Sequence, residues 1–279
     1  MTEIDKNIAD ILMQSHCIDI SKYDETFLNK SLQKRIIETC CGSVEEYYAL
    51  LEQDEKEVKI FSDSLQISYS EFFRNPLTFA GLERIVLPTL LLKKKNARHK
   101  EIRIWSAACA AGQEAYSLAI LLEELKNGDD KFSYRIFATD QCESMINKAQ
   151  KGQYLSSSLS NLSMKREEAW FSKQDDVYTV KPELKENIEF SVFDLLGDQL
   201  ACPPTSIFGD FDLLVCANLL FYYRPEFRKI IIEKIAACLA AGGYLVAGEA
   251  EREAIMNCNY YELFPQSAIF CSHEPKGAK

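Results

Sequence analysis

The stretch IRIWSAACAAGQEAYSLAILL, residues 102–122, decides the fold. Its first four residues, 102–105, are typical of a buried strand. A loop of small residues, Ala107–Gly112, follows, and from Glu114 to Lys126 the pattern is that of a helix. A strand that leads through a small-residue loop into a helix indicates the opening unit of a parallel sheet covered by helices.

Strands and helices continue to alternate toward the C-terminus. We predict a helix around Met145–Ala149 and another over Pro225–Ala240, which ends at Gly242-Gly243 as at a glycine C-cap. Further strands are predicted over Tyr134–Thr139, Asn187–Phe193, Phe211–Cys216, Tyr244–Ala247 and Ala268–Ser272. This alternation predicts an α/β fold with a Rossmann-like parallel sheet covered on both faces.

Two regions lie outside this alternation. Residues 1 to about 65 have helical patterns, including a capping box at Ser43–Glu46, and no strand pattern. We therefore predict an N-terminal helical domain over residues 1–80 and an α/β domain over residues 81–279. Residues 153–186 are too long for a simple connection, so we predict an inserted β-subdomain with a small antiparallel sheet there.

The composition argues against several classes of function. The 279 residues carry a formal net charge of −10, which argues against a general affinity for nucleic acid or anionic membrane. The ten cysteines form no C-x-x-C pair and the three histidines are scattered, so no metal site is predicted. No apolar run approaches the roughly 20 residues of a membrane helix, and the N-terminus lacks a signal-peptide pattern. We expect a cytoplasmic monomer that does not insert into the membrane.

Small and acidic residues follow four of the predicted strands: the loop Ala107–Glu114, Asp140, Asp194-Leu195 and Asn218. In open parallel sheets, ligands bind beyond the carboxyl ends of the strands, so these residues are expected to converge at one edge. Asp140 can accept hydrogen bonds from both hydroxyls of a ribose, and Asp194 from the amino group of an adenine. The alternative for each aspartate is a helix N-cap.

The loop after the first strand suits a cationic ligand. It has neither a G-x-G-x-x-G nor a G-x-x-x-x-G-K-[ST] pattern, so it is not predicted to hold a pyrophosphate. The small residues up to Gly112 let a ligand approach the backbone. Glu114 next to them favours a positive group, such as the amino group or sulfonium of S-adenosylmethionine.

Six blocks carry a family resemblance: SEFFRNPLTF (70–79), IRIWSAACAAGQEAYSLAILL (102–122), ATD (138–140), FSVFDLL (190–196), FDLLVCANLLFYY (211–223) and LAAGGYLVAGEAE (239–251). In this order and spacing, from about residue 60 to 250, the chain resembles the chemotaxis-receptor (protein-glutamate) O-methyltransferase family. The upstream helices are compatible with that family's helical N-terminal domain. The resemblance implies a Rossmann-like methyltransferase sheet, the cofactor S-adenosyl-L-methionine and the product S-adenosyl-L-homocysteine. It also implies methyl esterification of glutamates in the cytoplasmic helical part of a chemoreceptor.

The resemblance implies a role for each matching residue. Arg74 corresponds to the family's active-site arginine near the methyl group, and Asn218 with Tyr222 to the N-x-x-x-Y element that lines the methyl-transfer site. Residues 153–186 resemble the subdomain that docks receptors in some members. The residues predicted to contact the cofactor are Ser68, Ser70, Arg74, Ala108, Gly112, Glu114, Asp140, Met145, Asp194, Leu195 and Asn218.

A role for Arg74 in binding a carboxylate also follows from its neighbours in the sequence, without the resemblance. Phe72 and Phe73 flank it with apolar surface, and its guanidinium fork can hold a carboxylate by two hydrogen bonds. A glutamate carboxylate has a pKa near 4.3 in solution, so its attack on a sulfonium methyl needs no general base. The alternatives are a surface salt bridge for Arg74 and aromatic core packing for Tyr222.

Several positions depart from the family pattern. Ala217 stands where an arginine is usual, Gln113 replaces a glutamate, Ala115 a proline and Asp194 an asparagine. The N-terminal helix carries only Lys34-Arg35 where relatives have more arginines. Three alternatives therefore stay open. They are a methyltransferase with a different protein substrate, a non-catalytic module that binds S-adenosylmethionine or S-adenosylhomocysteine, and a nicotinamide oxidoreductase, which the missing glycine pattern disfavours.

Overall fold

The computed structural model describes residues 3–16, 18–66, 69–95, 97, 99–126, 132–197, 200–206, 209–258 and 260–272. Its contacts divide the chain into two compact units, of which the first comprises Met1–Ile67 and Leu219–Lys229 and the second Ser68–Asn218 and Ile230–Lys279. Residues 68–80, which the predicted domain boundary assigns to the helical domain, thus belong to the second unit. Within the described ranges, no helix is both long and apolar enough to cross a membrane.

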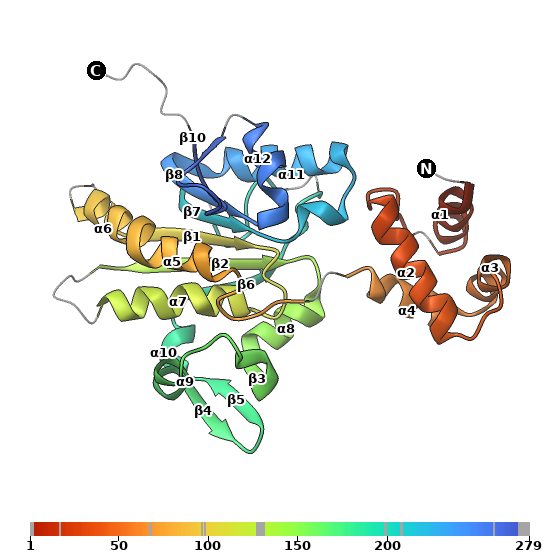
Figure 1. Ribbon diagram of the computed structural model, residues 1–279, viewed down its shortest axis with the longest axis horizontal. Coiled ribbons are helices and arrows are strands. Elements are labelled where there is room, and N and C mark those ends of the chain that lie inside the picture. Colours follow the sequence, from red (N-terminus) through yellow and green to blue (C-terminus); the bar gives the residue numbers. More distant parts are fainter. Residues whose placement is uncertain are drawn as a thin grey trace. The chain divides into compact units, whose positions relative to one another are not determined.

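The first unit is helical, as predicted for residues 1–65. Its described N-terminal residues form α1 (Glu3–His16), α2 (Glu25–Glu38), α3 (Val44–Gln53) and α4 (Glu55–Ser64), the red and orange helices of Figure 1. The predicted start at Ser43 is confirmed, because the Ser43 side chain accepts a hydrogen bond from the Glu46 N–H. The later segment adds the short 3-10 helix η3 (Leu220–Tyr222) through a β-bridge between Tyr23 and Tyr223.

The second unit contains a central sheet with the strand order β6-β2-β1-β7-β8-β10-β9. The strands are β1 (Ile102–Ala107), β2 (Tyr134–Asp140), β6 (Ile188–Val192), β7 (Phe211–Cys216), β8 (Leu239–Ala247), β9 (Tyr260–Glu262) and β10 (Ile269–Ser272). The helices of this unit are α5 (Pro76–Gly81), the π-helix η1 (Leu82–Val86), α6 (Leu87–Lys95), α7 (Gln113–Lys126), α8 (Glu143–Lys151), η4 (Glu249–Glu251) and α12 (Arg252–Met256). The helix α11 (Pro225–Ala237) begins in the first unit and belongs to the second from Ile230 onward.

The pairing of the strands makes β1 the point at which the strand order reverses. The strands from β6 to β8 run parallel, and only β10 and β9 pair antiparallel at the end of the sheet. From β1 the chain proceeds to β2 and β6 on one side, and then returns to β7 on the other side of β1. Such a reversal is the switch point where open α/β sheets bind ligands at the carboxyl ends of their strands. The predicted α/β, Rossmann-like fold is confirmed.

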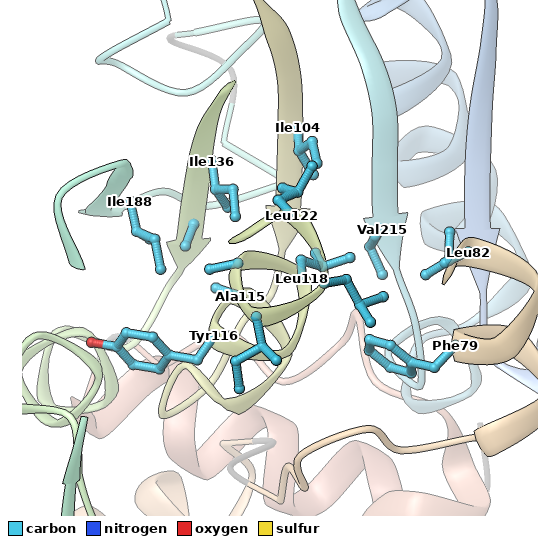
Figure 2. Packing of buried hydrophobic residues seen from close by; sticks show 14 of the residues in the cluster. Phe79, Leu82, Ile104, Ala115, Tyr116, Leu118, Leu122, Ile136, Ile188 and Val215 are labelled. Carbon is cyan, nitrogen blue, oxygen red and sulfur yellow. The ribbon is translucent and has the colours of Figure 1, made fainter. Parts of the chain in front are cut away.

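One face of the sheet packs on α5, η1, α6 and α7. Figure 2 shows Leu118 of α7 and Phe79 of α5 among the side chains gathered on this face, together with Ile104 of β1 and Ile136 of β2. These two isoleucines lie side by side in the register of the sheet. Alternation along the strands turns their neighbours to the opposite face, where the fully buried Trp105 lies. The sheet is therefore buried on both faces, which fits the apolar runs of its strands.

The predicted end of α11 is wrong. The helix ends at Ala237, and Gly242-Gly243 lies inside β8 instead of forming a helix cap. Gly242 has a φ of +71°, and the pairing of β8 with β7 shifts its register between Phe211 and Leu213. An irregularity of this kind needs a residue that tolerates positive φ, so the glycine serves a bulge in a strand.

Residues 153–186 form the predicted inserted subdomain with a small antiparallel sheet. Its elements are β3 (Gln153–Leu155), the 3-10 helix η2 (Ser156–Leu159), α9 (Met164–Trp170), β4 (Phe171–Gln174), β5 (Val177–Val180) and α10 (Pro182–Lys185). The strand order is β3-β5-β4, with both pairs antiparallel. Asp175, at the tight turn between β4 and β5, has a φ of +55°. In Figure 1 this subdomain is the green part of the chain beside α7 and α8.

Candidate active site

The loop between β1 and α7 is shaped by left-handed backbone conformations. Ala108 has a φ of +63°, Ala110 of +48° and Gly112 of +91°. A Cβ atom on Gly112 would lie 2.8 Å from the Cβ of Ala149 on α8. Left-handed alanines are strained, and such strain occurs most often at functional sites. The small residues therefore allow a tight turn at the switch point that larger side chains would prevent.

Asp140 fixes this loop through the main chain. At the end of β2, its Oδ2 accepts a hydrogen bond from the Ala110 N–H at 2.9 Å, and its Oδ1 accepts from the Cys142 N–H at 2.9 Å. Burial raises the pKa of Asp140, while these two hydrogen bonds act in the opposite direction. The N-cap position of α8 is Cys142, so the helix N-cap alternative for Asp140 is wrong. The carboxylate joins the ends of β1 and β2.

Glu114 provides a carboxyl group in the first turn of α7. Its Oε1 accepts a hydrogen bond from Ser106 Oγ at 2.6 Å. Burial raises the pKa of Glu114 to about 7, and the nearby Glu251 carboxylate adds to the increase, whereas the Ser106 hydrogen bond and the Arg74 guanidinium oppose it. A carboxyl group whose pKa is raised by burial is suited to a cationic ligand, which would favour its ionised form.

Gln113, next to Glu114, has an unsatisfied side chain. The residue is 6% exposed, and its Oε1 has no hydrogen-bond partner among the residues that the structure describes. A buried acceptor without a partner destabilises the folded chain, so such a group calls for a specific explanation. A ligand that donates a hydrogen bond would satisfy it.

Asp194 and Leu195 follow β6. Asp194 is exposed, and its Oδ1 accepts a hydrogen bond from the Leu196 N–H at 2.9 Å in a turn, not in a helix cap. Leu195 is buried. The preceding Phe193 N–H donates to the Asp140 carbonyl at 3.0 Å, which ties this segment to the end of β2. The helix N-cap alternative is therefore wrong for Asp194 as well.

Asn218 lies two residues beyond β7 in a left-handed conformation, with a φ of +62°. Its N–H donates to Glu251 Oε2 at 2.9 Å, and the Gly248 N–H donates to the same oxygen at 2.6 Å. A Cβ atom on Gly248 would lie 2.8 Å from this oxygen. Glu251, which is 2% exposed, thus holds together the segments that follow β7 and β8.

Sequence reasoning missed Glu251 and Ser106 as members of the site. Glu251 lies beyond the end of β8 in the block LAAGGYLVAGEAE, so its acidic character at a strand end was the available signal. Ser106 lies inside β1, where the alternation of side chains along the strand does not distinguish a site residue from a core residue. Both act on Glu114, Ser106 through a hydrogen bond and Glu251 through its charge.

Arg74 lies in a strained turn before α5. Its neighbours Phe73 and Asn75 have φ values of +49° and +61°. The guanidinium stacks on the Tyr69 ring with its Cζ 5.3 Å from the ring centroid. It also acts on the Glu114 carboxyl group electrostatically, which places positive charge near the first turn of α7.

The other predicted site residues are distributed unevenly. Ser70, Ala108 and Met145 are half-buried in the second unit, and Ser68 lies outside the described residues. Tyr222 belongs to the first unit, where its ring packs on Phe27 at a centroid distance of 4.8 Å. Its predicted place at the methyl-transfer site stays a prediction.

The structure describes two histidines, one in each unit. His16 is in α1 of the first unit, with its Nε2 3.2 Å from the Leu51 carbonyl. His99 precedes the amino end of β1, and the site lies beyond the carboxyl end. His99 is therefore not placed to act as a base next to Glu114 or Arg74.

Two family models match the chain. The CheR methyltransferase SAM binding domain matches residues 68–268, and the CheR methyltransferase all-alpha domain matches residues 6–65. These spans correspond to the sheet-containing unit and to the N-terminal helices.

Relatives that are chemotaxis protein methyltransferases match most of the chain. The protein of Listeria monocytogenes is 32% identical over 253 residues, which cover 91% of this chain and 90% of the relative. Chemotaxis protein methyltransferase 1 of Pseudomonas aeruginosa is 34% identical over 194 residues, or 68% of each chain. The Escherichia coli protein is 26% identical over 252 residues, which cover 88% of this chain and 83% of the relative. The chain therefore belongs to the CheR family of S-adenosylmethionine-dependent chemotaxis protein methyltransferases.

Proposed function

We propose that this protein transfers the methyl group of S-adenosylmethionine to glutamate carboxylates of a chemoreceptor-like protein and forms methyl esters there. One observation carries the proposal. Arg74, in the strained turn between Phe73 and Asn75, places positive charge close enough to Glu114 to act on its carboxyl group. A guanidinium beside the cofactor can hold a carboxylate substrate by a bidentate pair of hydrogen bonds. Family membership supports the same reaction class.

The residues of the second unit fit the cofactor. Glu114, with its pKa raised to about 7, matches a positively charged amino or sulfonium group, and the orphaned Gln113 Oε1 can accept a hydrogen bond from an ammonium group. The left-handed turn up to Gly112 carries only small side chains, and the absence of a Cβ on Gly112 lets the turn pack closely against Ala149 of α8. We assign Asp140 to the ribose hydroxyls and Asp194 to the adenine amino group.

The Asp140 carboxylate has acceptor positions left for a ligand. Asp140 already accepts two main-chain hydrogen bonds, and a carboxylate has about four acceptor positions, so it can accept ribose hydroxyls as well. The remaining predicted cofactor contacts keep their place in the proposal: Ser68, Ser70, Ala108, Met145, Leu195 and Asn218.

The chain's own contribution to the reaction is orientation. S-adenosylmethionine, when bound, supplies an electrophilic methyl group and retains the electron pair of the broken carbon–sulfur bond as S-adenosylhomocysteine. Arg74 holds the substrate carboxylate, and Asn218 lines its path. Tyr222 belongs to the first unit, so its place on that path stays what the resemblance implies. Because a glutamate is already ionised at neutral pH, no residue has to remove a proton. Alignment and exclusion of water then account for the rate increase.

Transfer of radiolabelled methyl groups to membranes that contain chemoreceptors tests this function. We expect the label to enter a receptor and to be released as methanol by mild base, as for a carboxyl ester. Label that resists base, or the absence of any transfer while S-adenosylhomocysteine still binds, would overturn the proposal. The second result would favour the non-catalytic binding module.

A methyltransferase with a different protein substrate is the second candidate. Ala217, where the family usually has an arginine, is partly buried against the apolar core of the sheet. A methyl group there cannot contribute a charge to the recognition of an acidic receptor helix. Labelling of total cell protein distinguishes the two candidates, because base-labile label on proteins other than chemoreceptors would favour the second.

A further inference from the structure

The inserted subdomain packs directly on the residue that precedes the arginine turn. Phe72 is fully buried, with its ring edge-to-face against Tyr154 of β3 at a centroid distance of 4.9 Å and against Phe171 of β4 at 5.3 Å. Tyr154 also donates a hydrogen bond from its hydroxyl to the Ala111 carbonyl at 2.6 Å. One aromatic side chain of the subdomain thus touches both the segment before Arg74 and the cofactor loop.

Arg166 of α9 extends this contact to the next residue of the turn. Its guanidinium lies over the Phe73 ring, with Cζ 4.4 Å from the ring centroid. Its Nε and Nη2 donate to the Glu124 carboxylate of α7 at 3.0 and 2.8 Å, and Nη2 also donates to Glu83 Oε1 at 3.1 Å. The side chain is 20% exposed. A planar guanidinium that is fixed by two carboxylates holds the phenyl ring from above.

The turn itself needs such support. Phe73 and Asn75, on both sides of Arg74, are left-handed residues with side chains, and strained backbone persists only where the surroundings impose it. One further contact comes from the Phe73 N–H, which donates to Ser117 Oγ of α7 at 3.0 Å. The Phe73 ring also packs on Phe79 of α5 at a centroid distance of 5.1 Å. The inserted subdomain thus supplies both ring partners of Phe72 named above and the guanidinium that lies over Phe73.

We propose that the inserted subdomain positions the catalytic arginine, with Arg166 as the positioning residue that clamps Phe73. Movement of α9 or of β3 is transmitted to the turn through Arg166 and Tyr154, and so to the guanidinium of Arg74. The subdomain therefore sets the rate of methyl transfer in addition to any role in docking a receptor. The kinetic consequence rests on the proposed function, whereas the clamp on the turn does not.

Arg166→Lys tests the clamp with the least disturbance. Lysine keeps the charge beside Glu124 but cannot form the bidentate pair or stack as a plane on Phe73. We expect kcat to fall by about tenfold or more, since a misplacement of about 1 Å can reduce rates by 10²-fold. The KM for the cofactor and the melting temperature should change little. In an Arg74→Ala background, Arg166→Lys should have no further effect on kcat, because the clamp acts on kcat only through the position of Arg74.

Lys181→Met is the matched control. Lys181 belongs to the same subdomain, but its Nζ donates within it, to the carbonyls of Glu168 and Ala169 at 2.9 and 2.8 Å. This variant should retain the wild-type kcat. Equal losses of kcat in Arg166→Lys and Lys181→Met would overturn the proposal, because they would indicate general weakening of the subdomain. If Arg166→Lys does not fold, Glu124→Gln is the variant to use instead, because it removes the charge that fixes the Arg166 guanidinium.

Amide hydrogen exchange of residues 70–76 provides a readout that is independent of activity. Arg166→Lys should increase exchange in this segment, including the Phe73 amide, and Lys181→Met should not. Unchanged exchange in Arg166→Lys would overturn the clamp. If wild-type protein transfers no methyl group while exchange rises as expected, the proposed function fails but the clamp does not. Increased exchange with an unchanged kcat would overturn the claim that the subdomain sets the rate.

Discussion

The two halves of the candidate site are held by different kinds of contact. The cofactor half, from Ala107 to Gly112 with Asp140, is fixed by main-chain hydrogen bonds to one carboxylate at the ends of neighbouring strands. The turn that carries Arg74 is fixed by side chains, several of which belong to the inserted subdomain. The comparison teaches that the loop proposed to bind the cofactor is held mainly by the sheet, with one added hydrogen bond from Tyr154 of the subdomain. The turn that carries the arginine depends much more on the insertion.

The largest expected effect separates the two halves. Arg74→Ala should lower kcat by about 10²–10³-fold, because a positively charged group that holds the reacting carboxylate is lost. The affinity for S-adenosylhomocysteine should fall much less than kcat, since Asp140 and Glu114 stay in place. Steady-state kinetics and calorimetry measure the two effects. Loss of cofactor binding together with activity would show that the halves are not separable.

Glu251→Ala should weaken the fold where β7 and β8 end. The substitution leaves the N–H groups of Gly248 and Asn218 without their acceptor. We expect the free energy of unfolding to fall by about 2–6 kcal/mol, as each of the two unsatisfied buried donors destabilises by about 1–3 kcal/mol. Glu251→Gln keeps an acceptor oxygen and should lose less. Denaturant titration of the three proteins checks this order, and equal stability of Ala and Gln variants contradicts it.

Asp140→Ala should weaken cofactor binding and leave the turn that carries Arg74 unchanged. The loop loses its main-chain anchor at Ala110, and the ribose loses a charge-assisted acceptor. The affinity for S-adenosylhomocysteine should fall by about 1–3 kcal/mol. Calorimetry gives this value directly, and exchange of residues 70–76 should stay at the wild-type level. An unchanged affinity would remove Asp140 from the site.

The smallest expected effect is a dependence of cofactor affinity on pH. Burial raises the pKa of Glu114 to about 7, so the carboxyl group is mostly protonated in the cofactor-free protein at pH 6. A cationic ligand favours the ionised form, so affinity should rise between about pH 6 and 8, by up to about tenfold per pH unit below the pKa. Binding should release a proton, and the Glu114→Gln variant should show neither effect. A wild-type affinity that falls over this range would contradict the assignment.

The same shift predicts the stability of the cofactor-free protein. The folded-state pKa of Glu114, about 7, lies above its ordinary value of 4.5. The folded chain therefore binds more protons than the unfolded chain between these values, and stability decreases as pH rises through that window. Relative to Glu114→Gln, the wild-type melting temperature should decline from about pH 4.5 to 7. A difference that is constant with pH would contradict this.

Local patterns were sufficient to predict the sheet and to place small and acidic residues at the ends of its strands, while the contact of these residues with the cofactor stays a prediction. The small residues before Gly112 and the acid at Asp140 follow from strand ends, because parallel strands bring their carboxyl ends to one edge. Gly242 was mistaken for a helix cap because a glycine after apolar residues has the same local pattern in a bulged strand. The clamp of Arg166 on Phe73 was not predictable from the sequence, since it joins residues that are far apart in the chain.

Mass spectrometry that locates the transferred methyl group tests the central claim most directly. After incubation of wild-type protein with S-adenosylmethionine and a receptor, we predict a methyl group on glutamate side chains of the receptor's cytoplasmic helices. The same sites should be unmodified with Arg74→Ala. A methyl group on a lysine, an arginine or an amino terminus, or methylated glutamates with Arg74→Ala at the wild-type level, would contradict the account.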